Sequence, residues 1–255
     1  MLNTVVAGEA NGKPPLLIVH GLFGSARNWG VLQKRLAVDR QVLAVDLRNH
    51  GDSFHDDDNS YGALADDLGQ VIKAHGGIAD VLGHSMGGKA AMVLALTKPE
   101  LVQHLLVADI APVAYGHSQM HNLEAMQSVD LSGVTRRAEV DVQLQENVPE
   151  APLRAFFLQS LALGENGARW KLNLDALGNA MDQILGFPDI TGSFAGPTLF
   201  VHGGLSDYVT PQHHQRILEL FPNAEFDTIA GAGHWLHAEK PREFQQAVTD
   251  FLARS

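Results

Sequence analysis

Ser85 lies between two glycines in the segment Gly83-His84-Ser85-Met86-Gly87, where an apolar stretch meets a helix-like run. The spacing G-x-S-x-G after a strand and before a helix is the pattern of a nucleophile elbow. Small neighbours let the helix begin close to the strand, and its N-terminal amides favour a developing oxyanion beside the serine. We therefore predict that Ser85 is a nucleophile, against the alternative that it is an ordinary turn residue.

A serine hydroxyl is a poor nucleophile without a base. His234, in "IAGAGHWLHAEKP" near the C-terminus, is the best candidate, and His237 is the alternative. A carboxylate must then hold the imidazole in the correct tautomer. Asp109 ends "HLLVAD" and Asp207 lies in "HGGLSDYVTP", so each follows a strand-like run between Ser85 and His234. Spacing alone does not distinguish these two aspartates.

An oxyanion hole needs two backbone N–H donors. We expect one from Met86, the residue after the nucleophile, and the other from Leu22 or Phe23 in the loop "HGLFG", with Leu22 preferred. Phe23 beside this loop, Phe157 and Trp235 are the residues expected to contact substrate. Other apolar residues of the same region (Phe156, Leu158, Leu161, Trp170) could line a pocket, but the alternative is that they pack helices together.

The elements that must position these residues alternate between strand-like and helix-like patterns. Short, continuously apolar runs occur at 16–20, 41–46, 79–85, 104–109 and 197–204. Continuous hydrophobicity is typical of strands covered on both faces, as in a parallel sheet. Helical patterns occur at 28–37, 61–75, 86–96, 211–221 and 241–252. This alternation predicts an α/β fold with a mostly parallel central sheet flanked by helices.

One region departs from that alternation. From residue 113 to 188 the apolar residues take helical spacing, as in "PLRAFFLQSLALG", and no run resembles a strand. We expect a helical cap at 113–188, inserted between two late strands of a core formed by 1–112 and 189–255. An insertion at the carboxyl ends of the strands would lie over the place where such sheets bind ligands.

Composition narrows the classes of function. The 255 residues carry a net charge of −11, which disfavours nucleic acid or an anionic membrane as the main partner. The chain has no cysteine, which removes disulfides and thiol chemistry and suits a cytoplasmic location. No secretory signal and no apolar run of about 20 residues is evident, so we expect no membrane span. No nucleotide-binding pattern is present, and we expect no cofactor.

Metal catalysis is an alternative. His117 and His121 are four residues apart on a predicted helix, and His213 and His214 are adjacent. Neither pair has an obvious third ligand at short spacing, so we expect no metal site.

Several segments together resemble the α/β-hydrolase family, most closely the small bacterial esterases of the YbfF type and the ABHD-eleven-like hydrolases. They are "HGLFGSARNW", "DLRNHGDS", "GHSMGGKAAM", "DIAPV" and "GAGHWLHAEKP", which follow the family's order and cover most of the chain outside the insertion. The resemblance implies a serine hydrolase with Ser85 as nucleophile, His234 as base and a helical cap. Its subgroup is expected to place the acid at Asp109, whereas the broader family more often places it at the position of Asp207. It also implies that Arg48 and His50 support the oxyanion loop.

We thus expect a carboxylesterase that hydrolyses short- to medium-chain acyl esters through an acyl-enzyme, with a small-molecule ester or thioester as its partner. Thioester hydrolysis, cofactor-free haloperoxidation and C–C bond hydrolysis use the same three residues and remain alternatives. A ligand receptor that uses the fold without turnover is a further one. The sequence predicts neither the physiological ester nor the oligomeric state.

Overall fold

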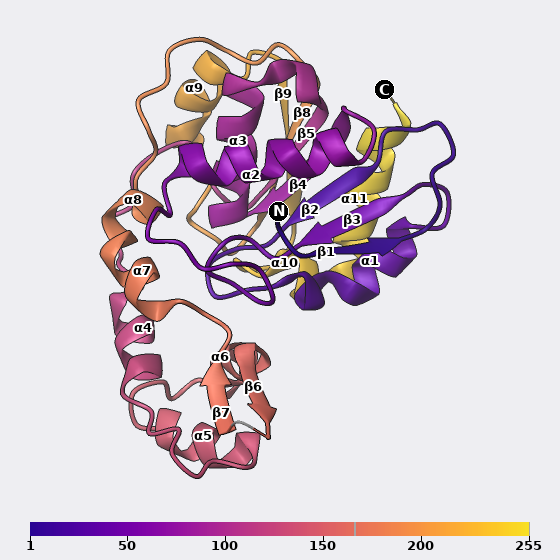
Figure 1. Cartoon of the computed structure of the whole chain (residues 1–255). Coiled ribbons are helices and arrows are strands. Elements are labelled where there is room, and N and C mark those ends of the chain that lie inside the picture. Colours follow the sequence, from indigo (N-terminus) through magenta and orange to yellow (C-terminus); the bar gives the residue numbers. More distant parts are fainter. Residues whose placement is uncertain (166, 255) are drawn as a thin grey trace.

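The computed structural model describes residues 1–165 and 167–254, and within them seven strands form one central sheet. The strand order is β1-β3-β2-β4-β5-β8-β9 (Figure 1). Only β1 runs antiparallel to its neighbour, and the other pairings are parallel. The strands are β1 (Thr4–Ala7), β2 (Leu16–Val19), β3 (Val42–Val45), β4 (Ala79–His84), β5 (Val102–Ala108), β8 (Thr198–Gly203) and β9 (Ala224–Ile229).

The five central strands lie where the apolar runs predict them, and the two edge strands were missed. The residues of β2, β3 and β4 are all buried, whereas those of β1, and all but the last of β9, are half-buried or exposed. An edge strand has less of its surface covered, so it carries no continuous apolar run to be recognised by.

Helices cover both faces of the sheet (Figure 1). Alternate residues of each strand point to opposite faces, so Leu17 and Val19 pack in one buried cluster while Leu16 and Ile18 pack in the other. On the first face lie α2 (Tyr61–Ala74), α3 (Met86–Thr97) and α9 (Pro211–Leu220). On the second lie α1 (Gly30–Leu36), α10 (Leu236–Glu239) and α11 (Pro241–Ala253). Short 3₁₀ helices are η1 (Ala26–Trp29), η2 (Pro99–Leu101) and η3 (Leu158–Ser160).

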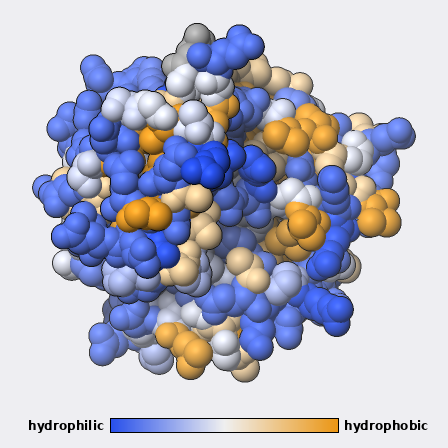
Figure 2. Space-filling model, turned by 90° about the horizontal axis from the view of Figure 1, so that it is seen from below, coloured by the Kyte–Doolittle hydropathy of each residue, from blue (hydrophilic) through white to orange (hydrophobic). Residues whose placement is uncertain are grey.

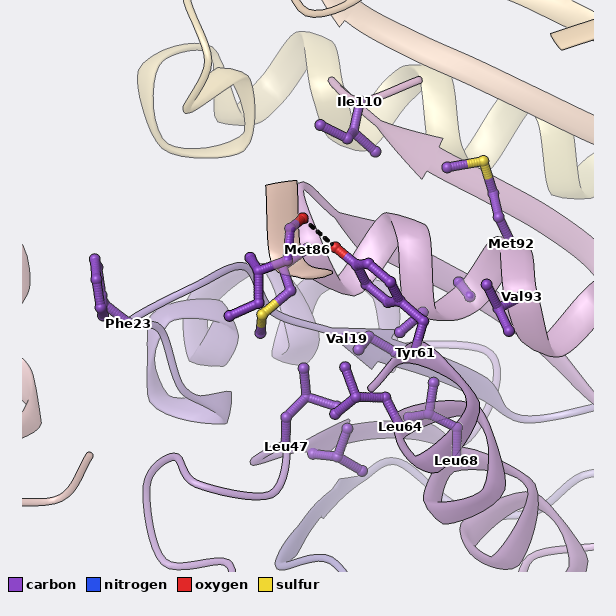
Figure 3. Packing of buried hydrophobic residues seen from close by; sticks show 14 of the residues in the cluster. Val19, Phe23, Leu47, Tyr61, Leu64, Leu68, Met86, Met92, Val93 and Ile110 are labelled. Carbon is purple, nitrogen blue, oxygen red and sulfur yellow. Dashed lines mark hydrogen bonds between the residues drawn. The ribbon is translucent and has the colours of Figure 1, made fainter. Parts of the chain in front are cut away.

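Figure 3 shows how the first face is built. Tyr61, Leu64 and Leu68 of α2 lie on the side of α3 that carries Val93, and all four side chains belong to one buried cluster between the helices and the sheet. This packing fixes α3, the helix that begins directly after Ser85, against the strands.

The insertion between β5 and β8 is not purely helical, so the expectation that it contains no strand is wrong. It contains α4 (Met120–Gln127), α5 (Arg137–Leu144), α6 (Ala151–Phe157), α7 (Leu174–Asn179) and α8 (Met181–Leu185), and an antiparallel pair of strands, β6 (Leu161–Gly164) and β7 (Gly167–Trp170). The run "PLRAFFLQSLALG" begins as α6, and its last residues form β6. Four residues are too few for a period of two to stand out beside the helical spacing before them.

The insertion lies at one end of the core (Figure 1), and Figure 2 views the molecule from that side. This surface is mainly hydrophilic, and its hydrophobic side chains form small separate groups. Within residues 1–165 and 167–254, no helix has the length and hydrophobicity needed to cross a lipid bilayer.

Candidate active site

Ser85 sits at the turn between β4 and α3, and its backbone has a left-handed φ of 53°. The glycines around it are required by close backbone contacts. A Cβ at Gly83 would lie 2.3 Å from the Gly87 carbonyl oxygen, and a Cβ at Gly87 would lie 2.3 Å from that of His20. The two glycines therefore let β4, α3 and the end of β2 approach closely enough to raise Ser85 above the sheet.

Left-handed backbone is concentrated at this site. In the described residues, the non-glycine positions with positive φ are Phe23 (63°), Asn49 (66°), Ser85 (53°) and Asp109 (52°). Such conformations are disfavoured for residues with a Cβ, and they persist only where the surrounding structure imposes them. The strained positions include the predicted nucleophile, one predicted acid and a residue of the predicted oxyanion loop.

The structure brings Ser85, His234 and Asp109 into one hydrogen-bonded chain. The His234 Nε2 lies 3.1 Å from Ser85 Oγ, and its Nδ1 lies 2.7 Å from Asp109 Oδ2. Asp207 lies exposed on the loop after β8. His237, the alternative base, is stacked on Trp29 with ring centroids 4.2 Å apart. Of the two aspartates, Asp109 is the one that contacts the imidazole.

Asp109 is fully buried, and its carboxylate has two further donors. The Gly203 N–H donates to Oδ1 at 3.0 Å, and the Ser206 hydroxyl donates to Oδ2 at 2.6 Å. A buried carboxylate needs such partners to remain charged. Sequence reasoning missed Ser206, because a serine beside Asp207 in a loop carries no distinguishing spacing.

The ring of His234 is held from two directions. Tyr208 stacks on it, with centroids 4.1 Å apart and planes 23° apart. Burial, followed by the nearby charges of Asp109 and Asp207, raises the pKa of Tyr208 to about 12, so Tyr208 adds no charge beside the imidazole. The Nε2 of the buried His84 contacts the His234 backbone carbonyl at 2.9 Å. These contacts keep the imidazole in line with Ser85.

The loop at residues 20–24 distinguishes between its two predicted donors. The Phe23 N–H donates to His50 Nε2 at 3.2 Å, so it is not free for substrate. In the described part of the chain, the Leu22 and Met86 N–H groups have no protein acceptor. Leu22 and Met86 are therefore the pair available to an oxyanion, and His50 holds the loop that presents Leu22.

His50 is locked in one tautomer, because its Nδ1 donates to the Arg48 carbonyl at 2.9 Å while Nε2 accepts from Phe23. We expect His50→Phe to lower kcat for p-nitrophenyl butyrate by about 10- to 100-fold with little change in KM, since a displaced donor weakens transition-state binding. The exposed His55 is the matched control, and His55→Phe should retain the wild-type kcat. A wild-type kcat in His50→Phe would show that the loop holds its position without His50.

Buried neutral histidines make a prediction about acid stability. Burial lowers the pKa of both His50 and His237 to about 3. An unfolded histidine has its pKa near 6.5, so between about pH 6.5 and 3 the unfolded chain binds more protons. The contribution of these two histidines to the free energy of unfolding is therefore fully present above about pH 6.5 and is lost as the pH falls toward 3. We expect the free energy of unfolding to drop by about 2–4 kcal/mol between pH 7 and pH 5.

Urea denaturation at the two pH values measures this drop. His237→Phe should show a drop that is smaller by about 2 kcal/mol, because the contribution of His237 is removed while those of the other buried histidines, His20, His50 and His84, remain. An equal drop in both proteins would contradict the assignment to His237.

A cleft of about 340 Å³ lies in front of Ser85. The three predicted substrate contacts, Phe23, Phe157 and Trp235, all lie in its wall, and Phe156 joins them. The remaining apolar candidates lie elsewhere: Leu158 and Leu161 pack in the core, and Trp170 donates its Nε1–H to a backbone carbonyl of α4. A polar side of the cleft, formed by His117, Gln119, Asn122 and Tyr208, was not predicted.

The histidine pairs weighed as metal ligands have other partners. His117 Nε2 contacts the Tyr208 hydroxyl at 2.6 Å, and His121 Nε2 contacts a backbone carbonyl at 2.6 Å. The N–H of Thr210 donates to His213, and His214 stacks on an aromatic ring. Among the described residues, no three histidine or acidic side chains are grouped to hold a metal ion.

Comparison with known proteins finds relatives that match most of the chain. The profile of a family described as "alpha/beta hydrolase fold" matches residues 14–241. The mouse protein named sn-1-specific diacylglycerol lipase ABHD11 is 44% identical, over 94% of this chain and 81% of its own. Esterase YbfF of Escherichia coli is 37% identical over 96% of each chain. The solved structure of a marine microorganism esterase superposes with a TM-score of 0.93 at 39% identity, covering 98% of each chain.

Proposed function

The chain belongs to the α/β-hydrolase family and is a serine hydrolase that acts on ester bonds, and from this premise we propose that Ser85, His234 and Asp109 perform the reaction. The observation that carries the proposal is the continuous set of hydrogen bonds from Asp109 through His234 to Ser85 at the wall of the cleft.

In the first half-reaction, His234 Nε2 accepts the proton of Ser85 as Oγ attacks the acyl carbonyl. Asp109 stabilises the imidazolium that forms, and its contact with Nδ1 holds the tautomer in which Nε2 is free to act as base. The N–H groups of Leu22 and Met86 receive the oxyanion. The tetrahedral intermediate collapses, and His234 returns the proton to the leaving alkoxide, which departs as the alcohol.

In the second half-reaction, His234 takes a proton from water, and the resulting hydroxide attacks the acyl-enzyme carbonyl. The same two amides stabilise the second oxyanion. Collapse of this intermediate releases the carboxylic acid and restores the Ser85 hydroxyl with the proton held by His234. Apart from the substrate and the water molecule, these steps use only groups of the chain.

We propose short- to medium-chain acyl esters as the substrate class, with Phe23, Phe157 and Trp235 contacting the acyl group. A cleft of about 340 Å³ is at the small end of the range for ligand pockets, which is roughly 300–1,000 Å³. The name of the mouse relative makes acylglycerols a second series to test. A chain-length series of p-nitrophenyl esters, from acetate to palmitate, should have its optimum below about ten acyl carbons, in keeping with a cleft of this size.

We also propose that residues 113–188 act as the cap over the cleft, that nucleic acid is not a partner, and that the protein works in the cytoplasm. The net charge of −11 and the absence of cysteine support the last two points.

Labelling with a fluorophosphonate probe tests the proposed nucleophile. Such probes phosphonylate a serine activated by a base, so peptide mass spectrometry should find the adduct on Ser85, with parallel loss of ester hydrolysis. Labelling of another serine, or hydrolysis that persists after Ser85 is fully modified, would refute the proposal.

A further inference from the structure

Lys89 is a buried cation in the wall of the cleft, and the ester hydrolysis described above does not use it. It lies one turn after Ser85 on α3, with its backbone N–H donating to the Ser85 carbonyl at 3.1 Å. Its side chain is 1% exposed. No Asp or Glu of the described chain forms an ion pair with it. A lysine buried without a carboxylate partner is rare and calls for another source of stabilisation.

That stabilisation comes from the carboxyl end of α8. The Lys89 Nζ donates to the carbonyls of Leu185 at 2.7 Å and Gly186 at 2.6 Å, with that of Ile184 at 3.5 Å. The last carbonyls of a helix lack partners within the helix, and a positive charge there is favourable. The Tyr115 ring lies 4.9 Å from the same ammonium. Lys89 therefore fastens the end of the insertion to the nucleophile helix.

A second side chain from the core also donates to the same turn. The Tyr61 hydroxyl on α2 donates to the Ile184 carbonyl at 2.7 Å, drawn as the dashed line in Figure 3. Both Ile184 and Leu185 line the cleft that contains Ser85. Lys89 and Tyr61 thus both hold a segment whose side chains form part of the wall of the cleft.

Burying a lysine at this position costs more free energy than burying an apolar side chain. Burial lowers its pKa to about 7, which means that the charged form is disfavoured by its surroundings. A methionine could occupy a similar volume without this penalty, but it would remove the Lys89 donor from the carbonyls of Leu185 and Gly186. What the lysine adds over an apolar side chain is a fixed position for residues 184–186.

We propose that Lys89 is a specificity-determining residue, because it fixes residues 184–186 against α3 and so sets the space beside Ser85 that is open to the acyl chain. This inference rests on the proposed ester hydrolysis at Ser85. The contacts favour it over direct binding of an anionic substrate, since the ammonium already donates to backbone carbonyls.

The test compares Lys89→Met with wild type on p-nitrophenyl esters of two to twelve acyl carbons. With the wall released, KM for the acetate should rise about 10-fold while kcat stays within about threefold, and the optimum should move to longer chains, as for a pocket enlarged by a methylene or two. Lys171→Met is the matched control, because Lys171 also bridges the insertion and the core, through Asp52, outside this cleft. It should keep the wild-type profile.

Fluorophosphonate labelling of Ser85 in Lys89→Met separates this proposal from the proposed function. Labelling with an unchanged chain-length profile overturns the role of Lys89 and leaves the nucleophile intact. A loss of activity confined to a hemisuccinate ester would instead assign Lys89 to anion binding. If Lys89→Met does not fold, Tyr61→Phe decides, because it releases the same turn. It should shift the profile in the same direction, with KM for the acetate raised about two- to threefold, and no shift would overturn the proposal.

Discussion

Replacing Ser85 with alanine should lower kcat for p-nitrophenyl butyrate by about 10⁵-fold, because removal of a triad nucleophile leaves only the oxyanion hole and binding. His234 and Asp109 would remain in place but would have no hydroxyl to activate. Steady-state hydrolysis at high enzyme concentration measures the residual rate. Ser132, which is exposed in the insertion, provides the matched control, and Ser132→Ala should keep full activity.

The same position offers a test of backbone strain. Alanine has the same left-handed penalty as serine at a φ of 53°, so Ser85→Ala should unfold at nearly the wild-type urea concentration. Glycine has no such penalty, and Ser85→Gly should be equally inactive but more stable by roughly 1–2 kcal/mol. Substantial activity in either variant would rule out Ser85 as the nucleophile, whereas a less stable Ser85→Gly would rule out stored strain at the elbow.

Much of the site could be predicted because its most distinctive residues are fixed by chain-local geometry. The nucleophile elbow needs glycines two residues before and after Ser85, and this pattern can be recognised in the sequence. The five central strands are also visible, since burial on both faces demands continuous apolar runs. The edge strands β1 and β9 form by pairing with other strands of the sheet, and β6 and β7 form by pairing with each other. These segments are short or partly exposed, so their sequences carry no clear strand pattern.

The roles that the residues alone did not reveal depend on polar contacts between parts of the chain that are far apart in sequence. Ser206 donates to Asp109 from 97 residues away, and Lys89 donates to Leu185 from 96 residues away. His50 reaches the oxyanion loop from 27 residues away, and only the resemblance to a family suggested its supporting role. A serine or lysine in such a position looks like any other polar residue, because what distinguishes it is the burial of its surroundings.

The spacing of residues in the sequence allows either Asp109 or Asp207 as the catalytic acid, and the structure distinguishes them. Both follow the carboxyl ends of adjacent parallel strands, β5 and β8, so topology brings both near His234. Asp109 has a left-handed φ of 52°, and its carboxylate contacts the imidazole of His234. The sequence "ADIAP" does not predict that backbone conformation.

Asp109→Asn should therefore lower kcat for p-nitrophenyl butyrate by about 10⁴-fold, whereas Asp207→Asn should stay within about twofold of wild type. The amide keeps the shape of the side chain but can present an N–H to His234 Nδ1, which favours the tautomer whose Nε2 carries the proton and cannot act as base. The Gly203 N–H, which donates to Oδ1, would favour the amide oxygen at that position and so turn the NH₂ group toward the imidazole, where the Ser206 hydroxyl can accept from it. Steady-state kinetics of both variants beside wild type, with circular dichroism to verify folding, make the comparison. If Asp207→Asn loses the activity and Asp109→Asn retains it, the working enzyme must rearrange the loop after β8 so that Asp207 replaces Asp109 at the imidazole.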